Sequence, residues 1–186
     1  MTEELILKYN NHCQKADGYN VGTIHGLYDK YSTLYTGYNM LYNEVPASLA
    51  KQNIKLRAKV DDNHKATDLV AQYLGEENIY NRFLENDNEK DIQSLTWIIE
   101  EGYFNIVLDR DGNSKSERDK ELLLGLKSES LKDKIMAILK TVYAVRNNMF
   151  HGNKDIQEYQ RFLLEPLLNL LRTLSMHLFE KLGEEI

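Results

Sequence analysis

The chain has little cysteine, little proline and no long apolar run, and each scarcity excludes certain classes of protein. Of its 186 residues, one is a cysteine, Cys13, and two are prolines, Pro46 and Pro166. One cysteine excludes an internal disulfide framework and leaves no second cysteine for a structural zinc site. No apolar stretch approaches the roughly 18 residues that cross a bilayer. Because the start, MTEELILKYNNHC, is acidic and amphipathic, we expect no secretory signal and a cytoplasmic protein.

An excess of positive charge is also missing. The chain carries 23 lysines and arginines against 29 acidic residues, a net charge of −6. This balance argues against a broadly basic surface for RNA, although a short cationic pocket fits within an acidic protein. The sequence contains no phosphate-binding loop, dinucleotide turn, HExxH zinc motif or nucleophile elbow. Adjacent carboxylates such as Glu76 and Glu77 point apart on a helix, so we expect neither a metal nor a cofactor.

Helical periodicity is what the sequence does contain. From Ile24 to Val45, apolar residues recur every three or four positions, and Pro46 is predicted to end this helix. The same spacing predicts helices over the ranges 62–74 and 90–101, a long helix from 131 that reaches His151–Gly152, and a last helix that continues to about 182. Ser116 with Asp119, and Asp155 with Glu158, have the spacing of helix-capping pairs. Pro166 is predicted to kink the last helix or to divide it.

These patterns predict an all-α protein, an up-and-down helical bundle with near-antiparallel neighbours. We expect one domain over residues 1–186, with a core over 24–182 and an added N-terminal helix over 1–16. The stretch GYFNIVLDRDGNSKSE predicts an irregular insertion around 102–116. The tyrosines of the 24–45 helix are expected in the core, and they also offer a face for dimer formation.

The segment RNNMFHGNK, residues 146–154, carries the candidate chemistry. Arg146 can bind a phosphate with two hydrogen bonds, and His151 can accept and donate protons near neutral pH. In a straight helix these residues are about 140° apart, so the helix must unwind at His151–Gly152 or two chains must share one site. Asn147 shares a helix face with His151 and can orient its ring.

The same segment resembles the catalytic motif of the HEPN superfamily, in which a histidine follows an arginine after four to six residues. The polar Asn147 behind the arginine, the FHG-plus-basic ending and the position before the last long helix carry the resemblance. It implies a helical, metal-independent endoribonuclease of a toxin–antitoxin or antiviral defence system. Arg146 and His151 would be catalytic, and Asn147, Asn148 and Lys154 would support them and bind phosphate. It also implies a homodimer with both motifs in one cleft, an RNA substrate and an antitoxin or regulatory partner.

Two alternatives from other classes stay open. One is a non-catalytic HEPN-like module that binds a nucleotide, an RNA or a partner protein. The other is a structural helical dimer, in which Arg146 forms a surface ion pair and His151–Gly152 is a plain helix ending. Asn147 and Asn148 would then only help to end the helix, because asparagine disfavours helix interiors.

Overall fold

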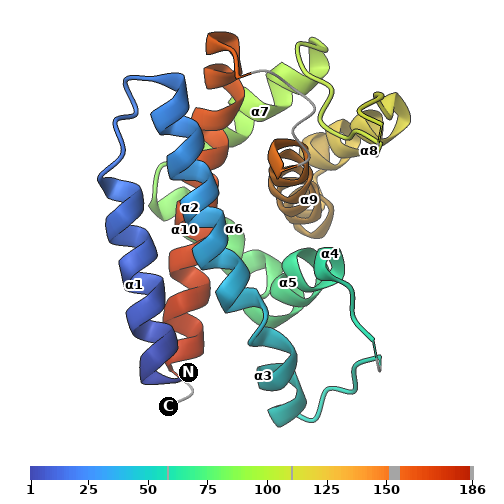
Figure 1. The fold of residues 1–186 in the computed structure, drawn as a ribbon. Helices are drawn as coiled ribbons and strands as arrows, with labels where there is room; N and C mark the ends of the chain where they lie inside the picture. The colour runs from blue at the N-terminus through green and yellow to red at the C-terminus, as the bar shows by residue number, and fades with distance from the viewer. Residues whose placement is uncertain (58, 110, 151–155, 185–186) are drawn as a thin grey trace.

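The computed structural model describes residues 1–57, 59–109, 111–150 and 156–184, and its regular structure within these ranges is α-helical (Figure 1). In chain order, the helices are α1 (Glu3–Asp17), α2 (Ile24–Tyr42), α3 (Val45–Lys51), α4 (Asp62–His64), α5 (Val70–Leu74), α6 (Glu76–Glu85), α7 (Glu89–Glu100), α8 (Ser116–Lys127), α9 (Leu131–Phe150) and α10 (Arg161–Gly183). No strand occurs in the described ranges beyond one isolated bridge between Leu108 and Ser114. The predicted all-α class is confirmed. No helix in these ranges is both long and apolar enough to cross a membrane.

Helix α2 is the centre of one layer, with α1 packed on one side of it and α10 on the other. Figure 1 shows α1 and α2 running in opposite directions, while α10 runs in the same direction as α2. Helix α9 is seen end-on in that view and therefore crosses this layer steeply. The predicted near-antiparallel packing describes α1 and α2 but is wrong for α9. Apolar spacing determines which face of a helix is buried, but not the direction of the helix that covers it.

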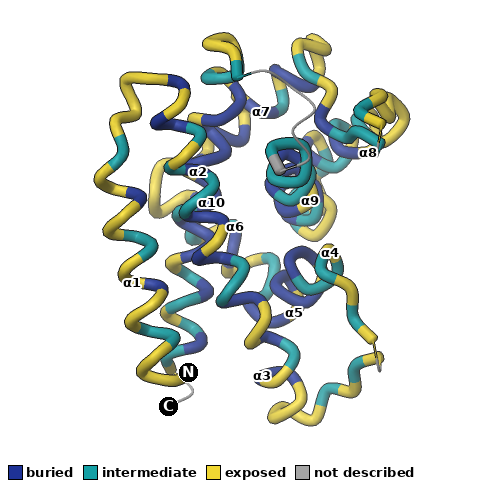
Figure 2. The backbone as a smooth tube through the Cα atoms, viewed as in Figure 1, coloured by how far each residue is buried: buried dark blue, intermediate teal, exposed yellow. Residues whose placement is uncertain are grey.

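Tyrosines form the buried face of α2. Figure 2 shows buried residues recurring along this helix. Tyr31, Tyr35, Tyr38 and Tyr42 are each at most 1% exposed. The Tyr31 hydroxyl donates to the backbone oxygen of Val142 at 2.9 Å, and Tyr38 donates to that of Ala66 at 2.6 Å. Their place in the core is confirmed. Because this chain's own helices cover them, the expectation that these tyrosines offer a dimer face is wrong.

Replacing Tyr38 with phenylalanine should destabilise the fold by about 1–2 kcal/mol, because it removes a hydroxyl that donates to a backbone oxygen inside the core. Urea unfolding measures this change in the free energy of unfolding. The matched control is Tyr103→Phe, since Tyr103 is 59% exposed and its hydroxyl can bond water instead. Equal stability of the two variants would show that the Tyr38 bond contributes nothing.

Several helices begin or end at other residues than those predicted. Helix α2 ends at Tyr42, and Pro46 lies in the first turn of α3, where a residue without an N–H group fits well. The predicted helix over 62–74 forms as α4, one π-helical turn over Lys65–Leu69, and α5. It ends at Gly75, whose φ of 83° suits glycine. Helices α3 and α6 are not among the predicted ones, since each is short.

The stretch between α7 and α8 is irregular, as predicted, and Asp119 fastens it. The Asp119 carboxylate accepts hydrogen bonds from the backbone N–H groups of Ile106 and Val107, at 3.1 and 2.8 Å. The predicted cap of α8 by Ser116 and Asp119 is therefore wrong, because the carboxylate binds the preceding loop instead. Helix α8 begins without a side-chain cap.

A 3-10 turn over Glu158–Gln160 precedes the last helix. Asp155, of the predicted cap, lies outside the described residues, and the reciprocal cap of this turn pairs Gln157 with Gln160. Helix α10 begins without a side-chain cap of its own. Helix α10 continues from Arg161 to Gly183 with Pro166 inside it, so the proline does not divide the helix.

Candidate active site

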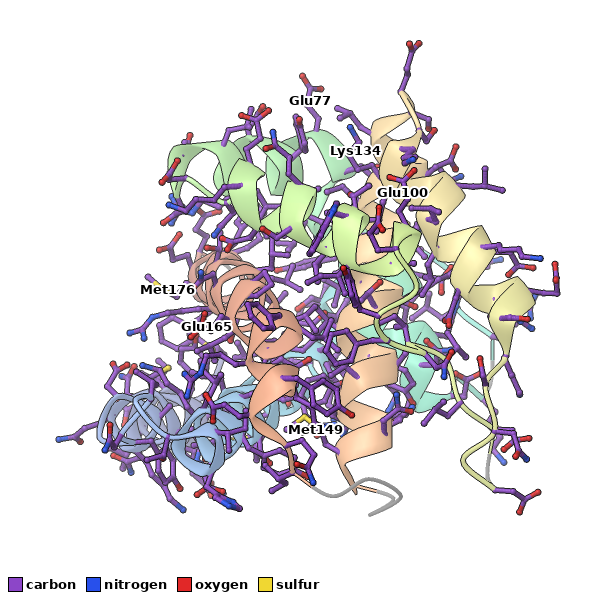
Figure 3. All side chains as sticks on the ribbon, turned by 90° about the horizontal axis from the view of Figure 1, so that it is seen from above. Glu77, Glu100, Lys134, Met149, Glu165 and Met176 are labelled. Carbon is purple, nitrogen blue, oxygen red and sulfur yellow. The ribbon has the colours of Figure 1, made fainter. Side chains whose placement is uncertain are left out.

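The C-terminal turn of α9 positions the described part of the RNNMFHGNK segment. The buried residues of α9 include Ile135, Ile138, Val142 and Val145, which hold one face of the helix against the core. Arg146, Asn147 and Asn148 follow directly and are half-buried. The Tyr28 hydroxyl of α2 donates to the backbone oxygen of Met149 at 2.7 Å, and Figure 3 shows Met149 between α9 and α10. Three helices thus fix this turn in place.

Arg146 is held by an aromatic ring and an amide. Its guanidinium carbon lies 5.3 Å from the centre of the Tyr35 ring of α2. Its Nη1 donates to Oδ1 of Asn147 at 3.0 Å. A guanidinium over an aromatic face is attracted to the ring and keeps its charge, so Arg146 is a positioned cation beside α2.

The two asparagines make specific contacts within a continuing helix. Asn148 Nδ2 donates to the backbone oxygen of Ile106 at 2.8 Å, and this bond ties α9 to the irregular stretch before α8. Asn147 accepts the bond from Arg146. Helix α9 includes both residues and extends to Phe150. The interpretation that the asparagines help to end the helix stays a prediction, because the residues that follow Phe150 lie outside the described ranges.

His151 and Lys154 lie outside the described residues, as do Gly152, Asn153 and Asp155. The convergence of His151 with Arg146, and the phosphate contact expected of Lys154, remain predictions. The structure places the half of the predicted site that precedes them.

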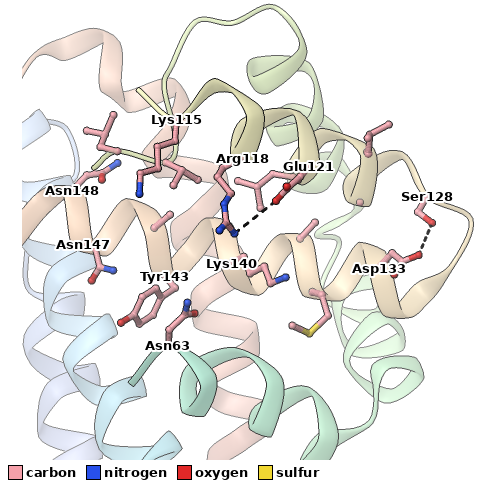
Figure 4. Close-up of a pocket in the computed structure, with 18 residues that line it drawn as sticks. Asn63, Lys115, Arg118, Glu121, Ser128, Asp133, Lys140, Tyr143, Asn147 and Asn148 are labelled. Atoms are coloured by element: carbon pink, nitrogen blue, oxygen red, sulfur yellow. Dashed lines mark hydrogen bonds and ion pairs between the residues drawn. The ribbon is translucent and has the colours of Figure 1, made fainter. Parts of the chain in front are cut away.

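A cleft of about 510 Å³ opens beside this half-site, between α8, α9 and α4 (Figure 4). Asn147 and Asn148 line it, together with Asn63 of α4. It also contains three cations that the sequence analysis does not single out: Lys115, Arg118 and Lys140. Figure 4 shows Lys115 extending from the start of α8 toward α9, near Asn148. Amides and a lysine therefore gather at the end of the cleft next to the motif.

Two carboxylates also line the cleft, but their placement leaves its motif end cationic. Asp133 lies in the first turn of α9, at the far end, where Ser128 donates to it at 3.3 Å. Glu121 lies 3.8 Å from Arg118 in an exposed pair, which water screens and weakens. Lys115 and Lys140 have no ion-pair partner among residues 1–57, 59–109, 111–150 and 156–184. An anionic group would find its most favourable position beside Asn147 and Asn148.

A network of hydroxyls and one carboxylate joins α9 to α2 and α4. Asp62 accepts from the Tyr42 hydroxyl at 3.0 Å and from the Tyr143 hydroxyl at 3.4 Å. Burial raises the pKa of Tyr143 and of Tyr42, so both remain protonated donors at neutral pH. Tyr143 is therefore unsuited to act as a general base. Its bond to Asp62 instead holds α4 against α9 and brings Asn63 to the cleft.

A sequence signal for part of this cleft exists in α9. Lys140, Tyr143 and Asn147 are spaced three and four residues apart, so they share the helix face that is opposite the buried one. Lys115 and Arg118 have no comparable signal, because they come from α8 and approach only through packing of α8 on α9.

Comparison of the chain with models of known protein families, with curated proteins and with solved structures gives no match.

Proposed function

We propose that the protein is a metal-independent endoribonuclease of the HEPN type, with Arg146 and His151 as its catalytic residues. The observation that carries the proposal is the position of Arg146, a charged side chain over the Tyr35 ring, whose neighbours Asn147 and Asn148 line a cleft with a cationic end. The motif spacing in the sequence supports it further. On this proposal the helices form a HEPN-type bundle, and two copies assemble so that both motifs line one cleft.

The reaction needs a base, an acid and a cation. A base takes the proton of the ribose 2′-OH, the 2′ oxygen forms a bond to the adjacent phosphorus, and the bond from phosphorus to the 5′ oxygen breaks. An acid then protonates the 5′ oxygen. His151 from each of two protomers supplies the base and the acid, and Arg146 stabilises the charge on the phosphorane. The products are a 2′,3′-cyclic phosphate and a 5′-hydroxyl, and DNA is not cleaved because it lacks the 2′-OH.

The direct test incubates purified protein with a mixed RNA pool in EDTA. Wild-type protein should cleave the RNA and leave cyclic-phosphate ends, whereas His151→Ala should leave the RNA intact. His25→Ala is the matched control, because His25 is exposed on α2 and lies outside the motif. Chemical analysis of the new 3′ ends identifies the mechanism, and DNA of the same sequence checks the requirement for the 2′-OH. Cleavage that survives His151→Ala would reject the assigned role of His151.

A non-catalytic binding module is the second candidate. The observation that favours it is the cleft itself, which combines lysines and amides with the apolar side chains of Leu122 and Met136. Such a lining suits a ligand with both an anionic and an apolar part, such as a nucleotide. Calorimetric titration with nucleotides, together with absence of RNA cleavage by the wild-type protein, would favour this function over the nuclease.

A further inference from the structure

The segment between α3 and α4 concentrates positive charge in an acidic protein. Residues 51–65 hold five cations (Lys51, Lys55, Arg57, Lys59 and Lys65) and two carboxylates (Asp61 and Asp62). The chain as a whole has a net charge of −6. This segment is therefore locally basic, although the net charge of the whole chain is negative.

Both ends of the segment are fixed by local hydrogen bonds. Asn53 has a φ of 62°, its N–H donates to the Ala50 oxygen at 3.0 Å, and the next N–H, of Ile54, donates to the Leu49 oxygen at 3.1 Å. This pair of bonds is the Schellman ending of a helix, which turns the chain sharply after α3. At the other end, Asp61 caps α4 by accepting from the backbone N–H of His64 at 2.8 Å. The segment therefore has defined ends.

Alternation along the segment exposes its cations. Ile54, Leu56 and Val60 are partly buried and pack against the core. Lys55, Arg57 and Lys59 are exposed. The apolar side chains thus anchor the segment to the core, while the cations between them form an exposed row.

This row lines a groove of about 1040 Å³, which we call the basic groove. Its lining includes four cations, Lys55, Arg57, Lys59 and Lys65, and no carboxylate. Within the described chain, none of these four has an ion-pair partner, although Lys65 donates to Asn43 at 2.9 Å. Some cations elsewhere are paired, as Lys120 is with Glu117 and Arg172 with Asp17. The basic groove therefore presents charge that the protein itself does not neutralise.

The basic groove adjoins the candidate active site through α4. Val60 and Lys65, which flank α4 in sequence, line the groove, while Asn63 of α4 lines the cleft that contains Asn147. Asp62 bonds to Tyr143 of α9 between them. Figure 1 shows the segment between α3 and α4 on the same side of the molecule as α4 and α5. The basic groove and the cleft therefore both lie next to α4.

We propose that the basic groove binds the phosphate backbone of an RNA strand and leads it to the cleft beside Arg146. This inference rests on the proposed function, in which RNA is the substrate. A row of regularly spaced cations matches a polymer with regularly spaced charges. The groove lining also includes the apolar Ile54, Leu56 and Val60 but no carboxylate, so the feature that selects its occupant is the set of cations. We therefore commit to RNA, and an acidic protein partner is an outcome of the test.

The test measures binding separately from cleavage. A labelled oligouridylate is titrated by fluorescence anisotropy in a His151→Ala background, over a series of salt concentrations. The test variant combines Lys55→Gln, Arg57→Gln and Lys59→Gln. The control combines Lys8→Gln, Lys15→Gln and Lys90→Gln, which remove equal charge from α1 and α7. Thermal unfolding of both confirms that they remain folded.

Loss of three phosphate contacts should lower the slope of log affinity against log salt by about 2, because each contact to a single strand contributes about 0.7. The affinity should fall by about tenfold or more at moderate salt, and the control should keep the wild-type slope. Equal losses in both triple variants, or no measurable RNA binding, would overturn the proposal. So would equally tight binding of polyglutamate, which would indicate an acidic protein partner.

The binding result is independent of the nuclease result. If wild-type protein fails to cleave RNA but the groove variant loses binding, the basic groove stands and the nuclease proposal fails. If wild-type protein cleaves RNA and the groove variant binds normally, the nuclease stands and the groove proposal fails.

Discussion

Replacing Arg146 with lysine is expected to slow RNA cleavage by about two to three orders of magnitude while the protein stays folded. Lysine keeps the charge, but it loses the planar group that lies over Tyr35 and the donor that Asn147 accepts. The cation then no longer occupies a fixed position where negative charge develops in the transition state. Single-turnover cleavage rates at saturating protein measure the loss without a contribution from substrate binding.

Matched variants separate the effect of the position of the Arg146 guanidinium from the effect of its charge. Arg82→Lys is the arginine control, because Arg82 is also partly buried but belongs to α6 and pairs with Glu180. It should cleave at the wild-type rate. Tyr35→Phe should also retain activity, since it keeps the ring that lies under Arg146. Tyr35→Leu removes the ring and should slow cleavage. Full activity of Arg146→Lys would exclude a positioned guanidinium from the mechanism.

Replacing Phe83 with alanine is expected to lower the free energy of unfolding by about 3–5 kcal/mol. Phe83 of α6 is 0% exposed, and α6 packs against α9 and α10. Removal of the ring leaves a cavity that rigid helices fill only partly. For a protein of ordinary stability this loss approaches the whole free energy of unfolding. Urea unfolding at equilibrium gives the change directly.

The neighbouring residue provides the control for this prediction. Leu84 is 43% exposed on the same helix, so Leu84→Ala removes a side chain of similar size without opening a core cavity. It should cost about 1 kcal/mol or less. Similar losses for Phe83→Ala and Leu84→Ala would mean that the Phe83 site collapses around the missing ring, contrary to a rigid core.

The sequence predicts the long helices well because they carry many turns of periodic signal. The buried stripe of α9 from Ile135 to Val145 repeats over several turns, and α10 persists through Pro166. Helices α3 and α6 are too short for that signal. Pro46 illustrates a second difficulty, since proline both ends one helix and suits the first turn of the next. The local sequence does not distinguish these two roles.

The candidate site is predictable where its residues are neighbours in the chain. Arg146 and Asn147 lie together as the motif implies, and Lys140 follows from helical spacing. Lys115 reaches the cleft because Asp119 fastens the loop that precedes α8, which is a contact no local pattern encodes. The basic groove is missed for a different reason. Net charge averages over the whole chain, whereas binding depends on the few cations that lack a carboxylate nearby.

The contacts of α1 and α2 with distant parts of the chain have a consequence for synthesis. The partner of Tyr31 is Val142, and the partners of Tyr9 and Asp17 are Ser175 and Arg172 of α10. A ribosome releases α1 and α2 long before it makes α9 and α10. The aromatic face of α2 therefore lacks its contacts with α9 and α10 for most of translation. Arg146 reaches its place over Tyr35 only after α9 has emerged. On the proposed nuclease function, this order keeps the nascent chain inactive until α9 has been made and has packed on α2.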